Sequence, residues 1–211
     1  MKKFTLLLLM AFYSSSFGQV DLVGGMGIIF INNYSLADYI NTNIPSPEKV
    51  GTFSSALELY CEADYSLLPN IELGAEIAYT LFSYNTNIAG ITNYNISYNH
   101  YKPSVLAYYV LSGYGYKLKL GGGLGPRFLY LEEKIITTSS YSTNGFGVLL
   151  RAQGHTLLSD DLYANIGSTL RYDFPGAPIK GSKKIFNSVL DKEVNINSFS
   201  ISVNIGVSYF F

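Results

Sequence analysis

The residues of this chain best suited to catalysis or ion pairing are charged side chains separated by even numbers of positions. Glu58 and Glu62 are four residues apart, and so are Glu72 and Glu76. Neighbouring carboxylates are the groups of acid–base catalysis, whereas carboxylates that face basic groups form ion pairs. The whole set comprises Glu58, Glu62, Glu72, Glu76, Lys117, Lys119, Arg127, Arg151 and Arg171. Even spacing places side chains on one face of a β-strand, so strands have to carry them.

Metal and cofactor chemistry has few residues available. The chain contains two His and one Cys, too few for a metal-ligand cluster, and no cofactor is expected. The glycine run at 121–125 lacks the helix that follows a phosphate-binding loop. These glycines are therefore expected to mark bends or close approaches of strands.

Composition narrows the class of protein. Of 211 residues, 48% are hydrophobic, 15% aromatic and only 14% charged. An ordinary soluble domain has roughly 25% charged residues, and the aromatic content excludes a disordered chain. The formal net charge of −1 is unlike that of basic nucleic-acid-binding proteins, so no nucleic-acid partner is expected.

The N-terminus has the features of a secretory signal peptide. Lys2 and Lys3 precede the apolar stretch 5–13, and the stretch 14–18 that follows is rich in small residues. The apolar stretch is too short for a membrane-spanning helix, which needs roughly 20 residues, so an N-terminal anchor is disfavoured. We therefore expect residues 1–18 to be a signal peptide for Sec export and residues 19–211 to form the mature protein.

Apolar and polar residues alternate along most of the mature chain. At the C-terminus, apolar residues occupy the odd positions from Ile201 to Phe211, and most even positions are polar. This period of two predicts β-strands. Eight strands are expected, at about 20–34, 53–65, 71–81, 102–111, 117–130, 146–155, 162–173 and 201–211. Several reach 12 residues or more, whereas strands of soluble proteins typically have about 5–6.

This pattern predicts an all-β fold, an eight-stranded antiparallel transmembrane β-barrel. The turns at 66–70, 112–115 and 159–161 are short. The long connections are 35–50, 86–101, 133–143 and 174–197. Short periplasmic turns and long extracellular loops are typical of outer-membrane barrels, and an even strand number places both termini on the periplasmic side. The alternative is a soluble, lipocalin-like barrel with its apolar face inward.

In a membrane barrel the apolar faces contact lipid and the charged residues point into the lumen. The second and third strands then carry acidic residues, including Asp64. The fifth to seventh strands carry basic residues, with Asp173 near the outer rim. These strands face one another across an eight-stranded ring, so we expect a cross-lumen network of ion pairs that fills the barrel. A gated proton or ion path along the same residues is the alternative.

The last strand resembles a known assembly signal. The sequence SISVNIGVSYFF is similar to the terminal β-signal of Gram-negative outer-membrane proteins. The matching positions are Val203, Ile205, Val207, Tyr209 and Phe211. In size and layout the mature chain resembles the small eight-stranded barrels OmpX and the barrel domain of OmpA, and its Gly- and Tyr-rich strands resemble the PorT-like barrels of Bacteroidota. The resemblance implies insertion by the barrel-assembly machinery into the outer membrane, among its lipids and lipopolysaccharide.

Some barrels of this class are enzymes that modify lipid A, and two histidines are the candidates for such a role. The deacylases of the class use a His-x-Ser pair, but His155 is followed by Thr156 and Leu157 and is expected toward the periplasmic side. His100 is expected near the outer rim, and Ser104 lies four residues further on, a spacing that matches no established site. No catalytic residue is therefore expected.

Function is expected in the long loops. The stretch 182–190 has an apolar i, i+1, i+4, i+5 pattern, which predicts a short amphipathic helix capped by its first serine. The candidate interaction residues are Lys183, Lys184, Ile185, Phe186, Val189 and Leu190. Lys180 joins these lysines as a group able to pair with lipopolysaccharide phosphates. Leu36, Tyr39 and Ile40 form a similar stripe in the first loop, and either stripe packs among the loops, covers the lumen or docks a partner.

We therefore expect a non-enzymatic barrel with a closed, ion-paired lumen. It would act as a structural or accessory subunit of a larger outer-membrane complex, through its loops or its lipid-facing wall. The alternatives are a lipid A-modifying enzyme and a small pore or transporter. An exposed cluster of His, Ser and acid at the outer rim would favour the enzyme, and a continuous water path past Glu76 and Arg127 would favour the pore.

Overall fold

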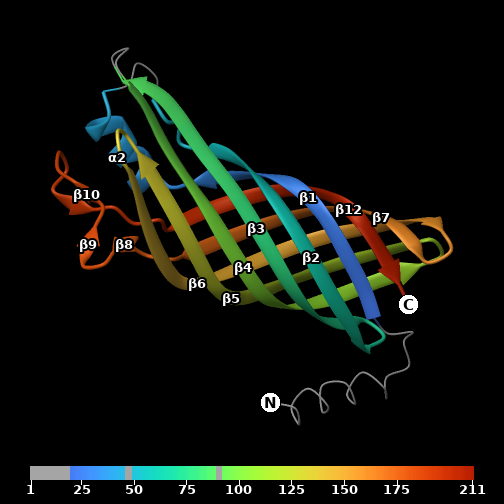
Figure 1. Ribbon diagram of the computed structural model, residues 1–211. Helices are drawn as coiled ribbons and strands as arrows, with labels where there is room; N and C mark the ends of the chain where they lie inside the picture. The colour runs from blue at the N-terminus through green and yellow to red at the C-terminus, as the bar shows by residue number, and fades with distance from the viewer. Residues whose placement is uncertain (1–19, 46–48, 89–91) are drawn as a thin grey trace, which may run out of the picture.

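The computed structural model describes residues 20–45, 49–88 and 92–211. The predicted signal peptide at 1–18 lies outside the described residues. The described residues contain no helix with the length and hydrophobicity of a membrane span. Most of the described chain is extended, and eight long strands form one closed sheet (Figure 1).

The long strands follow one another around a ring, and each pairs with the next in antiparallel register. They are β1 (Val20–Asn32), β2 (Ser54–Leu68), β3 (Ile71–Ile88), β4 (Thr92–Gly113), β5 (Tyr116–Lys134), β6 (Thr138–Ser159), β7 (Leu162–Phe174) and β12 (Ser198–Phe210). The ring closes because β12 pairs with β1, from Asn32↔Phe199 to Asp21↔Phe210. This architecture confirms the predicted eight-stranded antiparallel barrel.

The barrel has two unlike ends (Figure 1). The turn end carries both described chain ends and the tight turns at 69–70, 114–115 and 160–161. Gly115 and Asp160 adopt positive φ angles there, of 76° and 43°, as tight hairpin turns require. The loop end carries the remaining elements, which are α2 (Tyr34–Asn43), β8 (Ile179–Lys180), β9 (Lys183–Lys184), β10 (Phe186–Asn187) and β11 (Lys192–Glu193).

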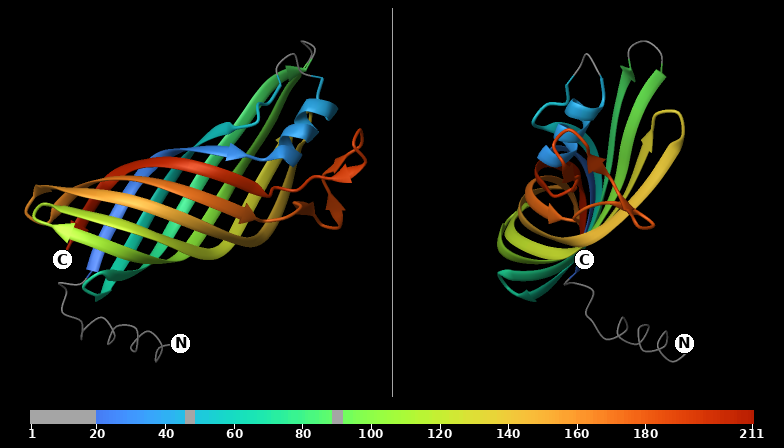
Figure 2. Two further views of the ribbon diagram at one scale, coloured as in Figure 1. Left: turned by 180° about the vertical axis from the view of Figure 1, so that it is seen from behind. Right: turned by 90° about the vertical axis from the view of Figure 1, so that its left-hand side faces the viewer.

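Two of the four predicted loops are strands. Residues 86–101 and 133–143 lie mostly within the hairpins β3–β4 and β5–β6, so the prediction that they are loops is wrong. Most of their outward positions hold Asn, Ser or Thr rather than apolar residues, which weakened the alternation in the sequence. As a result β3 to β6 form a tall wall that rises beyond the shorter β7, β12, β1 and β2 (Figure 2).

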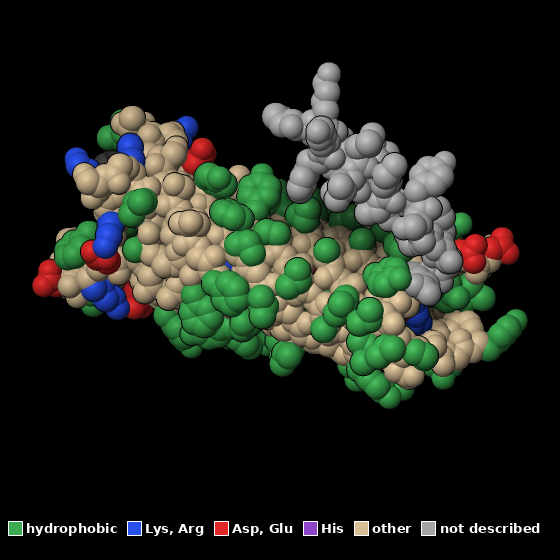
Figure 3. All heavy atoms as spheres, turned by 90° about the horizontal axis from the view of Figure 1, so that it is seen from below, with side chains coloured by type: hydrophobic (Ala, Val, Ile, Leu, Met, Phe, Trp, Pro, Cys, Tyr) green, Lys and Arg blue, Asp and Glu red, His purple; other side chains and the backbone are tan. Residues whose placement is uncertain are grey.

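The outward faces of the barrel strands form an apolar belt. On β12, for example, Val203, Ile205 and Val207 are between 51% and 61% exposed. Apolar side chains cover much of the barrel flank in Figure 3, whereas charged side chains gather at its ends. Outward tyrosines border the belt, with Tyr65, Tyr109 and Tyr209 toward the turn end and Tyr79, Tyr101 and Tyr130 toward the loop end. An apolar belt between aromatic girdles is the surface of a transmembrane barrel.

Of the assembly-signal residues, the first four point outward from β12 and Phe211 follows it.

Candidate functional site

The alternation of the strands sorts the predicted charged residues into the lumen. All nine point inward, eight of them are buried, and Lys117 near the turn end is partly exposed. Asp64 and Asp173 join them, and both are buried. The structure also brings in Asp21 and Lys102, which the sequence analysis missed. Asp21 lies on the first strand, where several glycines and a run of apolar residues obscure the alternation, and Lys102 precedes Pro103 in a strand with irregular alternation.

The middle of the lumen holds two arginines between three glutamates. Glu62 and Glu76 face each other directly in the β2–β3 ladder, where two like charges repel. Arg151, from the opposite wall on β6, forms ion pairs with both. Arg171 on β7 donates to Glu76 at 2.9 Å and lies 3.7 Å from Glu58. The two guanidinium groups thereby link strands on opposite sides of the barrel.

Lys102 completes this middle layer. Its ammonium group lies 2.9 Å from a carboxylate oxygen of Glu58, and both side chains are almost fully buried. Lys102 on β4 thus gives Glu58 on β2 a close cation, in addition to the more distant Arg171. A buried carboxylate with such partners avoids the large cost of an unpaired charge.

Arg127 has a different role at a gap in the β4–β5 ladder. Pro103 and Pro126 occupy facing positions in this ladder, which is interrupted between Tyr101↔Phe128 and Val105↔Leu124. Proline has no N–H, so two ladder hydrogen bonds are missing. The Arg127 guanidinium donates to the carbonyls of Pro103 at 3.1 Å and Pro126 at 2.9 Å, and it also pairs with Asp173. It therefore supplies the donors that the prolines lack.

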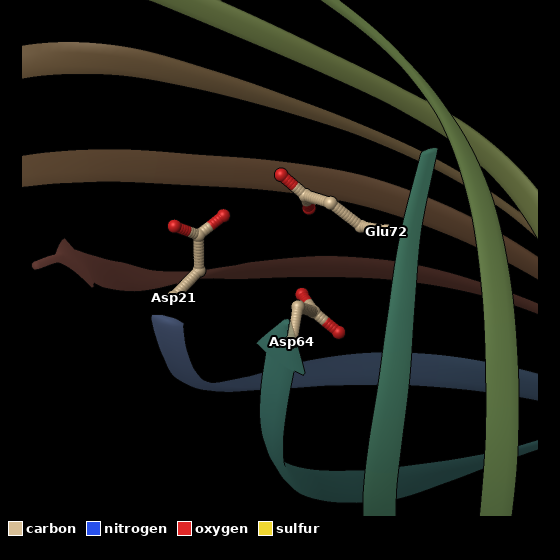
Figure 4. A group of neighbouring side chains, drawn as sticks. All are labelled: Asp21, Asp64 and Glu72. Carbon is tan, nitrogen blue, oxygen red and sulfur yellow. The ribbon is translucent and has the colours of Figure 1, made fainter. Parts of the chain in front are cut away.

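Three carboxylates meet near the turn end, on β1, β2 and β3. Oxygens of Asp21, Asp64 and Glu72 lie within 4.8 Å of one another (Figure 4). The Lys119 ammonium group lies among them, at 2.7 Å, 2.8 Å and 2.6 Å respectively, and Lys117 contacts Glu72 at 2.7 Å. The lysine ammonium thus occupies the position that a metal ion would need at this cluster.

The two histidines are enclosed. His155 Nδ1 lies 2.7 Å from Ser208 Oγ, a contact between β6 and β12 that no sequence motif indicated. Both residues are 1% exposed, and the ring of Phe210, 5.4 Å from the imidazole, covers them at the turn end. Lys117 lies 4.3 Å above the same ring. His100 is also buried, at 4% exposure, in the loop-end half of the lumen. Neither histidine has the accessible position that a hydrolytic site requires.

An apolar plug closes the lumen at the loop end. Asn33 caps α2 by accepting from the Leu36 N–H at 2.9 Å. Leu36 and Ile40 of α2 then pack with apolar residues of the last long connection and against the inner face of the tall wall. The cluster comprises Ile29, Ile31, Leu36, Ile40, Ile44, Phe82, Tyr94, Ile96, Tyr98, Leu129, Leu131, Ile185, Val194 and Ile196. The stripe of the first loop therefore covers the lumen.

A carboxylate holds α2 to the wall. Glu133 Oε1 accepts from the hydroxyls of Tyr39 at 2.8 Å and Tyr94 at 3.0 Å. Burial raises the pKa of the Tyr39 hydroxyl above its ordinary value, and the negative charge of Glu133 raises it further. Tyr39 therefore stays protonated and remains a hydrogen-bond donor through the physiological pH range.

The plug gives a direct prediction. The change Ile40→Asp places a carboxylate at a position that is 1% exposed, so α2 should leave the wall while the barrel stays folded. Limited proteolysis should then cut between residues 34 and 44, where the wild type resists. Tyr34→Asp, at a position 66% exposed, is the matched control and should keep the wild-type digestion pattern. Equal resistance of the Ile40 variant would contradict the packing of α2 in the plug.

The candidate interaction loop does not form the predicted helix. Lys183 and Lys184 form β9, Phe186 begins β10, and a turn follows. Asn187 Oδ1 accepts from the backbone N–H groups of the next two apolar residues at 3.1 Å each, a local bond that competes with helix formation. Ile185 is buried in the plug. Phe186, Val189 and Leu190 are 49%, 63% and 42% exposed.

The comparisons with known proteins address the fold. No protein-family model matches the chain, and no curated protein matches it. Among solved structures, a major outer membrane protein from Thermus thermophilus shares 14% identity at a TM-score of 0.54, covering 91% of this chain and 99% of that chain. Ail of Yersinia pestis, solved alone and with the heparin analogue sucrose octasulfate, shares 10% identity at 0.52, with coverage of 91% and 99%. The outer membrane protease OmpT of Escherichia coli shares 9% identity at 0.50, with coverage of 93% and 98%.

These likenesses confirm that the chain has the fold of an outer-membrane β-barrel. The fold is shared by proteins of different activity, since one of the three is a protease. The grouping with PorT-like barrels stays a prediction.

Proposed function

We propose that this protein is a non-enzymatic barrel of the outer membrane that serves as an accessory subunit of a larger outer-membrane complex. In this proposal residues 1–18 direct export, the turn end lies in the periplasm and the loop end faces outward. The barrel-assembly machinery recognises the last strand during insertion. The observation that carries the proposal is an ordered apolar tip at the loop end, outside the apolar belt.

The filled lumen supports a role for the outer surface rather than the interior. The plug covers one end, Phe210 lies across the other, and ion pairs occupy the space between them. A pore needs a continuous water path, and a lipid-modifying enzyme needs an accessible nucleophile or base. His155 and Ser208 are each 1% exposed, which disfavours a lipid-modifying enzyme that uses these residues.

The apolar tip consists of Phe186, Val189 and Leu190 on the β10–β11 hairpin. Its base is fixed to α2, because Asn43 donates to Asn187 Oδ1 at 2.8 Å and Ser188 donates to Asn43 Oδ1 at 2.8 Å. Figure 2 shows this hairpin projecting from the loop end. An ordered apolar surface outside the lipid is characteristic of a protein-binding site. Such a preorganised turn loses little conformational freedom when a partner binds.

The test is a pull-down of the tagged protein from its own outer membrane in mild detergent, followed by mass spectrometry. We expect larger outer-membrane proteins in stoichiometric amounts. The double change Val189→Ser and Leu190→Ser should reduce their recovery by about tenfold or more, because central apolar contacts carry most of the binding energy. Ile136→Ser, at another exposed apolar position of the loop end, is the control and should leave recovery unchanged. Recovery of the barrel alone from wild-type membranes would overturn the proposal.

A further inference from the structure

Lys119 and Asp64 form a buried pair that crosses the lumen near the turn end. The Lys119 ammonium nitrogen on β5 lies 2.8 Å from a carboxylate oxygen of Asp64 on β2, and both side chains are 0% exposed. The ring of Tyr108 lies 5.8 Å from the same nitrogen, and the ring of Phe210 lies 5.7 Å from it. An amine and a carboxyl group are therefore held in contact where water has little access.

Two further carboxylates contact the same ammonium group and can accept its proton (Figure 4). Oxygens of Glu72 and Asp21 lie 2.6 Å and 2.7 Å from Lys119 Nζ. Asp21 also faces Asp64 directly in the β1–β2 ladder, where like charges repel. Ionised groups are costly in a buried site, so transfer of a proton from the ammonium to a carboxylate replaces two charges by neutral groups. The cluster can thus present a neutral amine beside a carboxyl group.

Asp64 is the carboxylate of this cluster that other partners restrain least. Asp21 and Glu72 also pair with Lys117, at 2.5 Å and 2.7 Å. Asp64 Oδ1 is buried, and no N–H or hydroxyl group of the described residues donates to it. Gly74 faces Asp64 in the β2–β3 ladder, and a Cβ there would lie 2.1 Å from Asp64 Oδ1. The glycine therefore leaves room for this carboxyl group beside the amine.

The pair of Lys102 and Glu58, at 2.9 Å, is a useful contrast. The same oxygen of Glu58 accepts from the Thr80 hydroxyl at 3.2 Å and lies 3.7 Å from the Arg171 guanidinium. These groups stabilise the ionised carboxylate. Among the described residues, no second carboxylate contacts the Lys102 ammonium to take its proton. We expect Lys102 and Glu58 to stay an ion pair.

We propose that Lys119 and Asp64 condense into an amide bond that joins β5 to β2 inside the lumen. Glu72 or Asp21 takes a proton from the Lys119 ammonium group, and the neutral nitrogen then forms a bond to Asp64 Cγ. One carboxyl oxygen of Asp64 leaves as water. The ammonium group loses two of its three hydrogens, and both leave with that oxygen, so the step needs no oxidant and no external reagent. The proposal does not depend on the proposed function.

The first test is the intact mass of the purified, folded, full-length barrel after denaturation. We expect the wild type to be lighter by one water than its mature sequence. Lys119→Arg keeps the positive charge but cannot form this amide, so its mass should match its sequence. Lys117→Arg is the matched control, because Lys117 pairs with Asp21 and Glu72 but forms no ion pair with Asp64, and it should keep the loss of one water.

A tryptic digest of the wild type locates the bond. Trypsin should not cleave after Lys119, and the peptide that contains Lys119 should be joined to the peptide that contains Asp64. After boiling in dodecyl sulfate, the cross-linked wild type should migrate ahead of the Lys119→Arg variant, because the bond keeps the unfolded chain compact.

Two results would overturn the proposal: a wild-type mass equal to that of the unlinked sequence, or a bond from Lys119 to Asp21 or Glu72 instead of Asp64. The wild-type digest decides between these outcomes even if an arginine variant fails to fold. Because purified protein is used, neither result depends on whether a partner complex exists.

Discussion

The change Arg151→Met should destabilise the barrel by about 3–5 kcal/mol, the cost of removing one partner from a buried charge network. Arg151 is 3% exposed and pairs with both Glu62 and Glu76, which face each other in one ladder. Methionine has a similar length but no charge, so the two carboxylates would remain adjacent, with Arg171 still paired to Glu76. The measurement is the free energy of unfolding by urea in phospholipid vesicles.

A second substitution tests whether the Arg151 variant is destabilised by the loss of charge pairing or by the loss of packing. Adding Glu62→Gln to the Arg151 variant removes one of the two facing carboxylates, so part of the stability should return. The control is Lys192→Met, which removes a basic residue from a pair about half exposed on both sides and should leave stability unchanged. Wild-type stability of the Arg151 variant would show that the lumen network does not hold the barrel together.

The change Gly121→Val should impair folding strongly, although it alters a residue without a functional group. A Cβ at this position would lie 2.2 Å from the Ala107 carbonyl oxygen and 2.5 Å from the Tyr108 ring. Tyr108 crosses the lumen here to donate to Glu62 at 2.9 Å. Overpacking of this kind costs about 1–3 kcal/mol, and displacing the tyrosine adds the loss of a buried hydrogen bond.

Gly24→Val is the matched control, since a Cβ there meets nothing within 4 Å. It should fold as well as the wild type, because β-branched residues suit exposed strand positions. The assay is the folded fraction after refolding into vesicles, followed by the heat-dependent shift in electrophoretic mobility. Equal folding of the two variants would contradict the close approach of β4 and β5 at Gly121.

Some features of the candidate site could be predicted from the sequence and others could not. Glu62 and Glu76 were assignable to the lumen, because each lies on a strand with regular alternation. Lys102 was missed because Pro103 and the polar stretch before it obscured the period. The contact of His155 with Ser208 joins residues 53 positions apart on strands that are not adjacent in sequence, and no local pattern reports it.

At the loop end, too, some features could be predicted from the sequence and others could not. The apolar stripe of Leu36 and Ile40 was visible in the sequence, but whether it would meet a partner, other loops or the lumen was open. The predicted helix at 182–190 was wrong because Asn187 bonds to its own following backbone and supports a turn. Periodicity over nine residues does not distinguish a short amphipathic helix from a hairpin with one buried residue.

The sequence by itself determined the strand number, the closed barrel and the sorting of apolar residues outward and charged residues inward. These properties follow from the period of two of a single strand and from the need to pair every backbone group in lipid. Only the tertiary structure decided which charges meet, that Arg151 lies between Glu62 and Glu76 and that Lys119 occupies the carboxylate cluster. It also decided that α2 fills the loop end. Such contacts depend on ring closure and on the stagger between distant strands, which no single segment of the chain encodes.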